Sequence, residues 1–246
     1  MQYAILSDIH GNLEALEAVL ASARAQGAEQ IVCLGDVVGY GPQPVECLQL
    51  LLKANATIVA GNHDFAVADR IDISNFNVFA REATLWTREQ LGDEERRILS
   101  ELPLVAEFDG FTAVHGTLHT PELFDYVQTT YDAHLSMQEM QQPLCFIGHS
   151  HVPITFVQDE TISYHLSPTT TVSSHTKTIV NVGSVGQPRD FDARACYALY
   201  DAQRHRVERV RIPYDIDSVI AKIRRAGLPR PLGERLRAGR DRKSVV

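Results

Sequence analysis

The chain has 246 residues, of which 44% are hydrophobic and 22% charged, and its formal net charge at pH 7 is −8. These proportions are ordinary for a globular protein and supply enough apolar residues for one large α/β core. The acidic balance argues against nucleic acid as a partner, and no apolar run approaches the length that spans a bilayer, so we expect no membrane partner.

The first 60 residues alternate between strand-like and helix-like patterns. Asn12 can cap a helix whose apolar residues recur every three or four positions, and Gly27 can end it. The predicted order is a strand at 3–7, a helix to Gln26, a strand at 31–34, a helix from Pro44 to Lys53 and a strand at 58–60. This βαβαβ order predicts a parallel sheet with right-handed crossovers.

The remainder of the chain reads as helices followed by short strands. Residues 65–102 predict two or more helices with a break near Gly92, and residues 116–142 predict a polar insertion that could form a lid, with a helix near 133–140. Strands are expected at 104–108, 112–114, 144–147, 154–157, 179–182, 197–200 and 207–212, and a helix at 216–225. We expect one domain over residues 1–226.

The C-terminal residues 227–246 form a basic tail. Between Lys222 and Lys243 the sequence has nine lysine or arginine residues and two acidic residues. Such a segment can contact a polyanion, but a solvated or frayed terminus is the favoured interpretation.

Cysteine usage indicates the compartment. The four cysteines form no CxxC pair, and Cys33 and Cys145 lie inside apolar strand-like runs, where a free cysteine acts as a small hydrophobic residue. The sequence also enters a strand directly after Met1, without a basic and then apolar targeting segment. We therefore expect a reducing, cytoplasmic location.

Several of the predicted strands end on side chains that bind metals. The run Val32–Leu34 is followed by Gly35 and Asp36, and the other strand ends carry the same kinds of group. These are Asp8 and His10, Asn62, His63 and Asp64, His115, and His149 and His151. Since ligands of open α/β sheets lie beyond the carboxyl ends of the strands, we expect these groups to form one site.

The residue types in this set suit a divalent first-row metal, which accepts both carboxylate and imidazole ligands. Asp36, the lone carboxylate at a central strand end, is placed to bridge two ions. The candidate metal ligands are Asp8, His10, Asp36, Asn62, His115, His149 and His151. Two histidines within three residues, as at 149–151, are uncommon in loops, but for any single motif an ordinary turn is the favoured interpretation. Their occurrence together at successive strand ends favours a site for two cations. Two close cations can activate a water and clamp a phosphoryl group during an in-line displacement.

The same motifs in the same order resemble the calcineurin-like metallophosphoesterase superfamily, over residues 3–151. That resemblance implies an α/β fold, a four-layer α/β/β/α sandwich of the metallophosphoesterase type, with a dinuclear metal site. It further implies that Asp8, His10, Asp36 and His151 hold one ion, and that Asp36, Asn62, His115 and His149 hold the other. His63 matches the family's histidine that contacts the phosphate and can protonate the leaving oxygen.

A closer resemblance is to the small bacterial and archaeal phosphodiesterase-like branch, through the runs 35–42 and 181–189. One position departs from much of the superfamily, because Gly39 stands where an aspartate usually orients the catalytic histidine. Asp64 or Tyr40 could take over that role. The protein phosphatases of the superfamily have arginines where this chain has Ala60 and Tyr40-Gly41, which disfavours a phosphoprotein substrate.

Two further segments could contribute to a substrate site. The loop Gly183–Arg189 follows a strand and is rich in backbone donors, so with Arg189 it could hold a phosphate or a ribose edge. An ordinary surface turn with a solvated arginine is an equal alternative. His119 or Tyr126 could face the substrate, although ordinary loop positions are favoured for both.

We therefore predict a metal-dependent phosphoesterase that acts on a small phosphorylated molecule or nucleotide, as a phosphodiesterase or phosphomonoesterase, through a metal-bridging hydroxide. Its cofactors would be two divalent ions, and Mn, Fe, Zn and Ni all accept this set of ligands. The alternative is a catalytically weak or inactive metal-binding scaffold with the same fold. The filled ligand positions favour the enzyme, while Gly39 keeps the alternative open.

Overall fold

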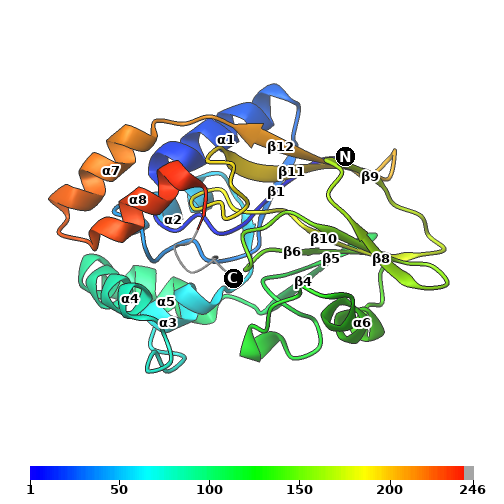
Figure 1. Cartoon of the computed structure of the whole chain (residues 1–246), viewed down its shortest axis with the longest axis horizontal. Helices are drawn as coiled ribbons and strands as arrows, with labels where there is room; N and C mark the ends of the chain where they lie inside the picture. The colour runs from blue at the N-terminus through cyan, green and yellow to red at the C-terminus, as the bar shows by residue number, and fades with distance from the viewer. Residues whose placement is uncertain (241–246) are drawn as a thin grey trace.

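Two six-stranded mixed sheets pack face to face, with helices on their outer faces (Figure 1). The structure is a computed structural model that describes residues 1–240. The strand order is β3-β2-β1-β11-β12-β9 in the first sheet and β4-β5-β6-β10-β7-β8 in the second. The four-layer α/β/β/α arrangement expected from the sequence is therefore confirmed.

The first sheet begins with the predicted parallel strands. These are β1 (Gln2–Leu6), β2 (Gln30–Cys33) and β3 (Thr57–Ile58), connected by α1 (Leu13–Ala25) and α2 (Pro44–Lys53). The Asn12 side chain accepts a hydrogen bond from the Ala15 amide and caps α1 as expected. Antiparallel strands complete the sheet: β11 (Ala195–Asp201), β12 (Arg206–Ile212) and β9 (Thr169–Thr171).

The second sheet is assembled from the middle of the chain. Its strands are β4 (Val105–Phe108), β5 (Phe111–Val114), β6 (Leu144–Ile147), β10 (Lys177–Asn181), β7 (Thr155–Gln158) and β8 (Ile162–His165). The predicted two-residue turn at Asp109-Gly110 joins β4 to β5, where Phe108 pairs with Phe111. The edge strands β8 and β9 were not predicted, because they are short and carry mostly polar or exposed residues.

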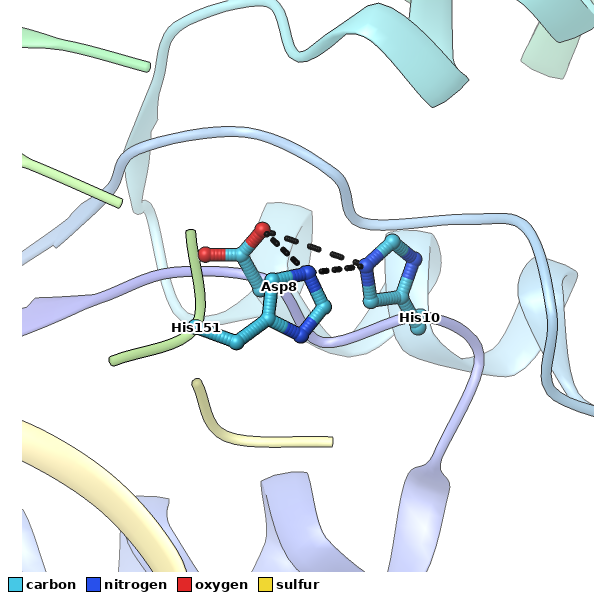
Figure 2. A group of neighbouring side chains, drawn as sticks. All are labelled: Asp8, His10 and His151. Carbon is cyan, nitrogen blue, oxygen red and sulfur yellow. Dashed lines mark hydrogen bonds and ion pairs between the residues drawn. The ribbon is translucent and has the colours of Figure 1, made fainter. Parts of the chain in front are cut away.

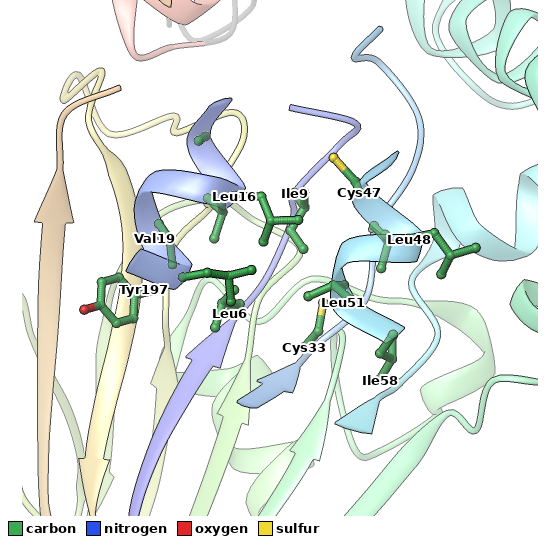
Figure 3. Close-up of a cluster of buried hydrophobic side chains, with 14 of the residues drawn as sticks. Leu6, Ile9, Leu16, Val19, Cys33, Cys47, Leu48, Leu51, Ile58 and Tyr197 are labelled. Carbon is green, nitrogen blue, oxygen red and sulfur yellow. The ribbon is translucent and has the colours of Figure 1, made fainter. Parts of the chain in front are cut away.

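Side chains of β1 alternate between two cores. Tyr3 and Ile5 point between the sheets, whereas Ala4 and Leu6 join the core beneath α1 and α2. Figure 3 shows this outer core, in which Leu6 meets α1. Since both faces of β1 are covered, its carboxyl end is held rigidly.

The insertion at 116–142 supplies the helix of the fourth layer. Helix α6 (Thr130–Glu139) packs Ala133 and Met137 against the outer face of the second sheet, opposite α1 in Figure 1. The helical part of the insertion therefore covers the sheet, and the segment before it contains the short 3₁₀ turn Pro121–Leu123. A lid at 116–142 stays a prediction.

Three helices lie between β3 and β4. They are α3 (Asn62–Val67), α4 (Val78–Gln90) and α5 (Asp93–Glu101), and Gly92 is the N-cap of α5, so the predicted break is confirmed. Residues 68–77 are turns and bends rather than helix. Asn77 caps α4 by accepting from the Phe79 and Ala80 amides, which explains why α4 begins only there.

The C-terminal segment packs on the fold. Helix α7 (Ile216–Arg225) is as predicted, but α8 (Arg230–Ala238) buries Leu232 and Leu236 against α7 and the Tyr40 ring. The expectation of a solvated or frayed tail is therefore wrong for these residues, because an apolar stripe recurs at helical spacing among the arginines. The boundary at residue 226 stays a prediction, and residues 241–246 of the tail lie outside the described residues.

Among residues 1–240, no helix combines the length and the apolar character that crossing a membrane requires.

The packing between the sheets centres on Phe111. Its fully buried ring lies 4.4 Å from the Phe108 ring, 5.0 Å from Tyr3 and 5.4 Å from Phe146, measured between centroids. We expect Phe111→Ala to lower the free energy of unfolding by about 3–5 kcal/mol, because it leaves a cavity between rigid sheets. Urea denaturation followed by circular dichroism measures this change.

Tyr131→Ala is the matched control for that experiment, because its ring is 67% exposed at the start of α6. It should change the free energy of unfolding by no more than about 0.5 kcal/mol. Equal losses in the two variants would contradict this description of the core.

Candidate metal centre

The carboxyl ends of strands from both sheets meet at one buried site. Asp8 and His10 follow β1 and Asp36 follows β2 in the first sheet, while His115 follows β5 and His149 and His151 follow β6 in the second. All six side chains are buried. The structure thus brings together the predicted carboxylates and imidazoles in two groups, and a third set, His10, Asp36 and His63, overlaps both.

The first group contains Asp8, His10 and His151 (Figure 2). The two imidazole Nε2 atoms lie 3.2 Å apart. Asp8 Oδ1 lies 3.2 Å from Nε2 of His151 and 3.8 Å from Nε2 of His10. Three possible ligand atoms therefore surround one small volume.

The second group contains Asp36, His115 and His149. Nε2 of His115 lies 3.0 Å from Nδ1 of His149 and 3.5 Å from Oδ2 of Asp36. The same Asp36 oxygen lies 3.6 Å from Nε2 of His10, which belongs to the first group. One carboxylate oxygen therefore stands between the two groups.

Backbone carbonyls set the tautomers of three imidazoles. Nδ1 of His10 lies 3.1 Å from the Val38 carbonyl, and Nδ1 of His115 lies 2.7 Å from the Leu34 carbonyl. Nδ1 of His151 lies 2.6 Å from the Gln187 carbonyl. Because a carbonyl can only accept, each Nδ1 donates, and the neutral rings of His10 and His151 therefore turn their Nε2 lone pairs toward the centre.

Each carboxylate uses one oxygen for the backbone and presents the other to the imidazoles. Oδ2 of Asp8 accepts from the His149 amide at 3.0 Å, and Oδ1 of Asp36 accepts from the His63 amide at 2.8 Å. Gly61 makes the second contact possible, because a Cβ there would lie 2.1 Å from Asp36 Oδ1. The remaining oxygens, Asp8 Oδ1 and Asp36 Oδ2, face the imidazole nitrogens.

The backbone of the site is in an uncommon conformation. Positive φ angles occur at Asp8, His10, Asp36, His149 and His151, with values of 53°, 49°, 51°, 65° and 59°. A left-handed non-glycine residue costs on the order of 1 kcal/mol, and such residues gather at functional sites. The backbone conformation that directs these five side chains inward therefore lowers the free energy of unfolding.

The pKa shifts leave Asp36 ionised and His149 neutral, whereas His115 carries a proton that a metal ion would have to displace. Burial raises the pKa of Asp36, but His115 and His63 outweigh it and hold that pKa well below its usual range. Burial, together with the charge of His115, lowers the pKa of His149 to about 3. Burial lowers the pKa of His115 too, but Asp36 outweighs it and raises that pKa to about 9. The site therefore attracts positive charge beside Asp36.

The donor set fits divalent cations. The side-chain oxygen of Asn62, at the start of α3, is buried and accepts no hydrogen bond within residues 1–240. Facing imidazole lone pairs and ionised carboxylates repel one another until a cation lies between them. Nitrogen and oxygen ligands of this kind suit Mn, Fe, Zn or Ni.

His63 lies beside the first group without a carboxylate partner. Its Nδ1 accepts or donates no hydrogen bond within the described residues, and a Cβ on Gly39 would lie 2.7 Å from it. Asp64 does not replace the missing aspartate, because its carboxylate accepts from the amides of Val37, Val38 and Gly61.

Ring packing holds His63 instead. The Tyr40 ring lies 4.5 Å from the His63 ring, the His10 ring 5.0 Å and the Phe76 ring 5.2 Å, between centroids. Tyr40 therefore restrains the imidazole by contact rather than by a hydrogen bond. Burial, which outweighs the opposing effect of Asp36, lowers the pKa of His63 to about 4, so the ring is neutral at pH 7.

The loop Gly183–Arg189 lies against the metal centre. The Val185 and Gly186 amides donate to the Ser7 and Asp8 carbonyls at 2.9 Å each, and the Arg189 amide donates to the His151 carbonyl at 3.3 Å. Residues 183–188 are buried, so the alternative of an ordinary surface turn is wrong. Arg189 is thereby placed at the edge of the site.

Other residues of the site carried little or no signal in the sequence. The Tyr126 ring stacks on the His149 imidazole, with centroids 4.0 Å apart and planes 15° apart. The sequence left open whether Tyr126 faces the substrate and favoured an ordinary loop position for it. It gave no prediction for Gln187 or Arg235. Tyr126 and Arg235 stand outside any motif, and Gln187, although it lies in the run 181–189, had no role that its residue type alone could indicate.

Comparisons with known proteins show what the chain as a whole is similar to. The calcineurin-like phosphoesterase superfamily domain matches residues 1–205. An uncharacterised protein, MJ0912, from Methanocaldococcus jannaschii is 38% identical over 242 residues, which covers 96% of this chain and 98% of that protein. The phosphodiesterase YfcE of Escherichia coli strain K12 is 27% identical over 175 residues, or 68% of this chain and 78% of YfcE.

A solved structure extends the likeness to the whole fold. The metallophosphoesterase of Sphaerobacter thermophilus superposes with a TM-score of 0.86 at 41% sequence identity, covering 97% of this chain and 99% of that one. The resemblance identified from the motifs, to small bacterial and archaeal relatives, is thus confirmed by bacterial and archaeal matches over nearly the full length. The chain belongs to the calcineurin-like phosphoesterase superfamily.

Proposed function

We propose that this protein is a dinuclear metal-dependent phosphoester hydrolase acting on a small phosphorylated molecule. One observation carries the proposal: Oδ2 of Asp36 lies 3.6 Å from an imidazole nitrogen of one group and 3.5 Å from an imidazole nitrogen of the other. A single carboxylate oxygen between two sets of ligands suits a bridge between two ions. The similarity to phosphodiesterase YfcE supports a diester as the first substrate class to test.

The residues divide between two ions as the resemblance implies. Asp8, His10 and His151 would hold one ion and Asn62, His115 and His149 the other, with Asp36 shared. Divalent ions at such a site activate water at neutral pH and neutralise charge on the phosphoryl oxygens. The nitrogen and oxygen donors leave the choice among Mn, Fe, Zn and Ni to availability.

His63 and Arg189 would act on the substrate itself. The neutral His63 ring, held by Tyr40 and Phe76, can donate a hydrogen bond to a phosphoryl oxygen and orient it. The Arg189 guanidinium can pair with a further phosphoryl oxygen in the two-pronged geometry that arginine favours. A scaffold without turnover would not need these groups beside the metal ligands, so the enzyme is favoured over the alternative.

Asp36→Ala tests the shared ligand. We expect metal-dependent hydrolysis of bis(p-nitrophenyl) phosphate to fall to background, because both ions lose a ligand at once. Steady-state kinetics at saturating Mn²⁺ measure this loss. Asp93→Ala removes a fully exposed carboxylate at the start of α5 and should leave the rate unchanged. Full activity in Asp36→Ala would refute the assignment.

His63→Ala separates substrate contact from metal binding. We expect kcat to fall by about 100-fold or more, the scale typical of a lost proton-donating group, while the metal content stays at the wild-type value. Elemental analysis of the same samples supplies the second readout. Loss of metal together with activity would instead make His63 a ligand.

Metal removal should affect both activity and stability. Dialysis against a chelator should abolish hydrolysis and lower the melting temperature, because the inward-facing lone pairs and carboxylates then repel one another. Reloading should restore both, with about two equivalents of metal per chain by elemental analysis. Two bound equivalents without turnover on any phosphoester would favour the scaffold alternative.

A further inference from the structure

The candidate metal centre is most accessible beside His149. Among the six side chains of the two groups, His149 is the most exposed at 8%, whereas the other five are exposed by 2% or less. The Tyr126 ring stacks on this imidazole, with centroids 4.0 Å apart, and Tyr126 itself is 47% exposed. A substrate that reaches the metal ligands on this side therefore contacts Tyr126.

A pocket of about 310 Å³ lies in the insertion and shares Tyr126 with this side of the metal centre. We call it the insertion pocket. Its volume is at the lower end of the range for small-molecule sites. Besides Tyr126, it is lined by Thr117, His119, Thr120, Asp125, Asp132 and Leu135.

The walls of the insertion pocket are fixed relative to the metal centre. Thr117 is 4% exposed and follows His115 by two residues. A Cβ on Gly116 would lie 2.7 Å from the Asp125 carbonyl oxygen, so the chain after β5 and the segment that carries Asp125 are in close backbone contact. Tyr126 is held by its stacking on His149 and by a hydrogen bond with Arg189. The pocket is therefore attached to the site at both His115 and His149.

Several polar groups of the insertion pocket are available to a ligand. The Asp125 carboxylate and the Thr120 hydroxyl make no hydrogen bond or ion pair within residues 1–240. Oδ2 of Asp132 accepts from two amides of the preceding turn, at 3.1 and 2.9 Å, and its Oδ1 has no partner in the same part of the chain. The pocket thus combines room for a small molecule with free acceptors and a free hydroxyl.

The chemistry of the lining favours a neutral alcohol. Neither lysine nor arginine is among the described residues that line the pocket, and the His119 imidazole lies 3.7 Å from the Glu139 carboxylate. A second phosphoryl or carboxylate group would therefore face carboxylates without a cation to balance it. Alcohol hydroxyls can donate to the carboxylates and also accept from a threonine hydroxyl, whereas an ammonium group can only donate. Leu135 and the Tyr126 ring supply apolar surface for a carbon skeleton.

We propose that the insertion pocket binds the alcohol portion of the phosphoester substrate and selects alcohols with neighbouring hydroxyl groups, such as a glycerol or a sugar moiety. This inference rests on the proposed function, in which the metal centre holds the phosphoryl group. Asp125 is the main determinant of the selection, because an ionised carboxylate is a strong acceptor for sugar hydroxyls. The substrate class is therefore a phosphoester of a small polyol.

The test uses equilibrium binding, which needs no turnover. The probes are alkylphosphonates of increasing chain length, each with and without two neighbouring hydroxyl groups at the far end of the chain, and their P–C bonds resist hydrolysis. Isothermal titration calorimetry on the Mn²⁺-loaded protein gives a Kd for each. At the best-matched length we expect the dihydroxy compound to bind about tenfold or more tightly than the plain one, the scale of a hydrogen bond to a charged group.

Asp125→Ala should reduce that advantage to about twofold or less and leave both the metal content and the Kd of the plain alkylphosphonate unchanged. Thr120→Val, which removes a hydroxyl and keeps the shape, should act in the same direction and is the second variant if Asp125→Ala proves unfolded by circular dichroism. Glu122→Ala is the matched control, because Glu122 is an exposed carboxylate of the same segment that does not line the pocket. It should keep the wild-type preference.

Three results would overturn the assignment of the pocket: equal binding of the plain and dihydroxy compounds at every length, an unchanged advantage in both Asp125→Ala and Thr120→Val, or tighter binding of the matching aminoalkylphosphonate than of the dihydroxy compound. Turnover of phosphoesters together with any of these would leave the proposed function standing. Absence of turnover in a protein that still shows the Asp125-dependent preference would refute the proposed function alone.

Discussion

The site is dominated by the electrostatic repulsion among buried imidazole lone pairs and carboxylate oxygens that face one another. His10 and His151 direct their Nε2 atoms at each other across 3.2 Å, and both are held there by Nδ1 hydrogen bonds to backbone carbonyls. Ionised carboxylates of Asp8 and Asp36 lie beside them. These lone pairs and negative charges stabilise one another only when positive charge lies between them, and bound cations would supply that charge to all of them together. The packing of the surrounding fold offsets this repulsion and keeps the four side chains in place.

That frame requires close contact between backbone segments. Glycine at position 61 lets the α3 N-terminus approach the Asp36 carboxylate, and glycine at 39 lets the loop after β2 touch the His63 ring. The same Gly39 contact removes the room in which an aspartate would orient His63. His63, the proposed catalytic histidine, is therefore restrained by Tyr40 and Phe76 rather than by a carboxylate, and its neutral state follows from burial. This is a physical difference from the pattern of much of the superfamily, not an erosion of the metal ligands.

The C-terminal helices follow the residues 1–205 that match the superfamily domain, and they pack against the candidate site. Leu232 and Leu236 of α8 pack with Tyr40, so the helix supports the ring that restrains His63 and places Arg235 over that ring. Gln187 connects α8 to the candidate metal ligand His151.

Local patterns in the sequence were sufficient for most elements and for the chemistry of the site. The helix that Asn12 caps, the turn at Asp109-Gly110 and the strands ending at Asp36 and His149 depend on neighbours a few residues away, so the sequence determined them directly. Only the tertiary structure decided which candidate ligand atoms face one another. His10 and His151 lie 141 residues apart in the sequence, so their Nε2 atoms come together only when the two sheets pack. It also decided the environment of His63 and the docking of α8, because both depend on contacts between distant segments whose residue types, a glycine, a tyrosine and an arginine, have no distinctive spacing.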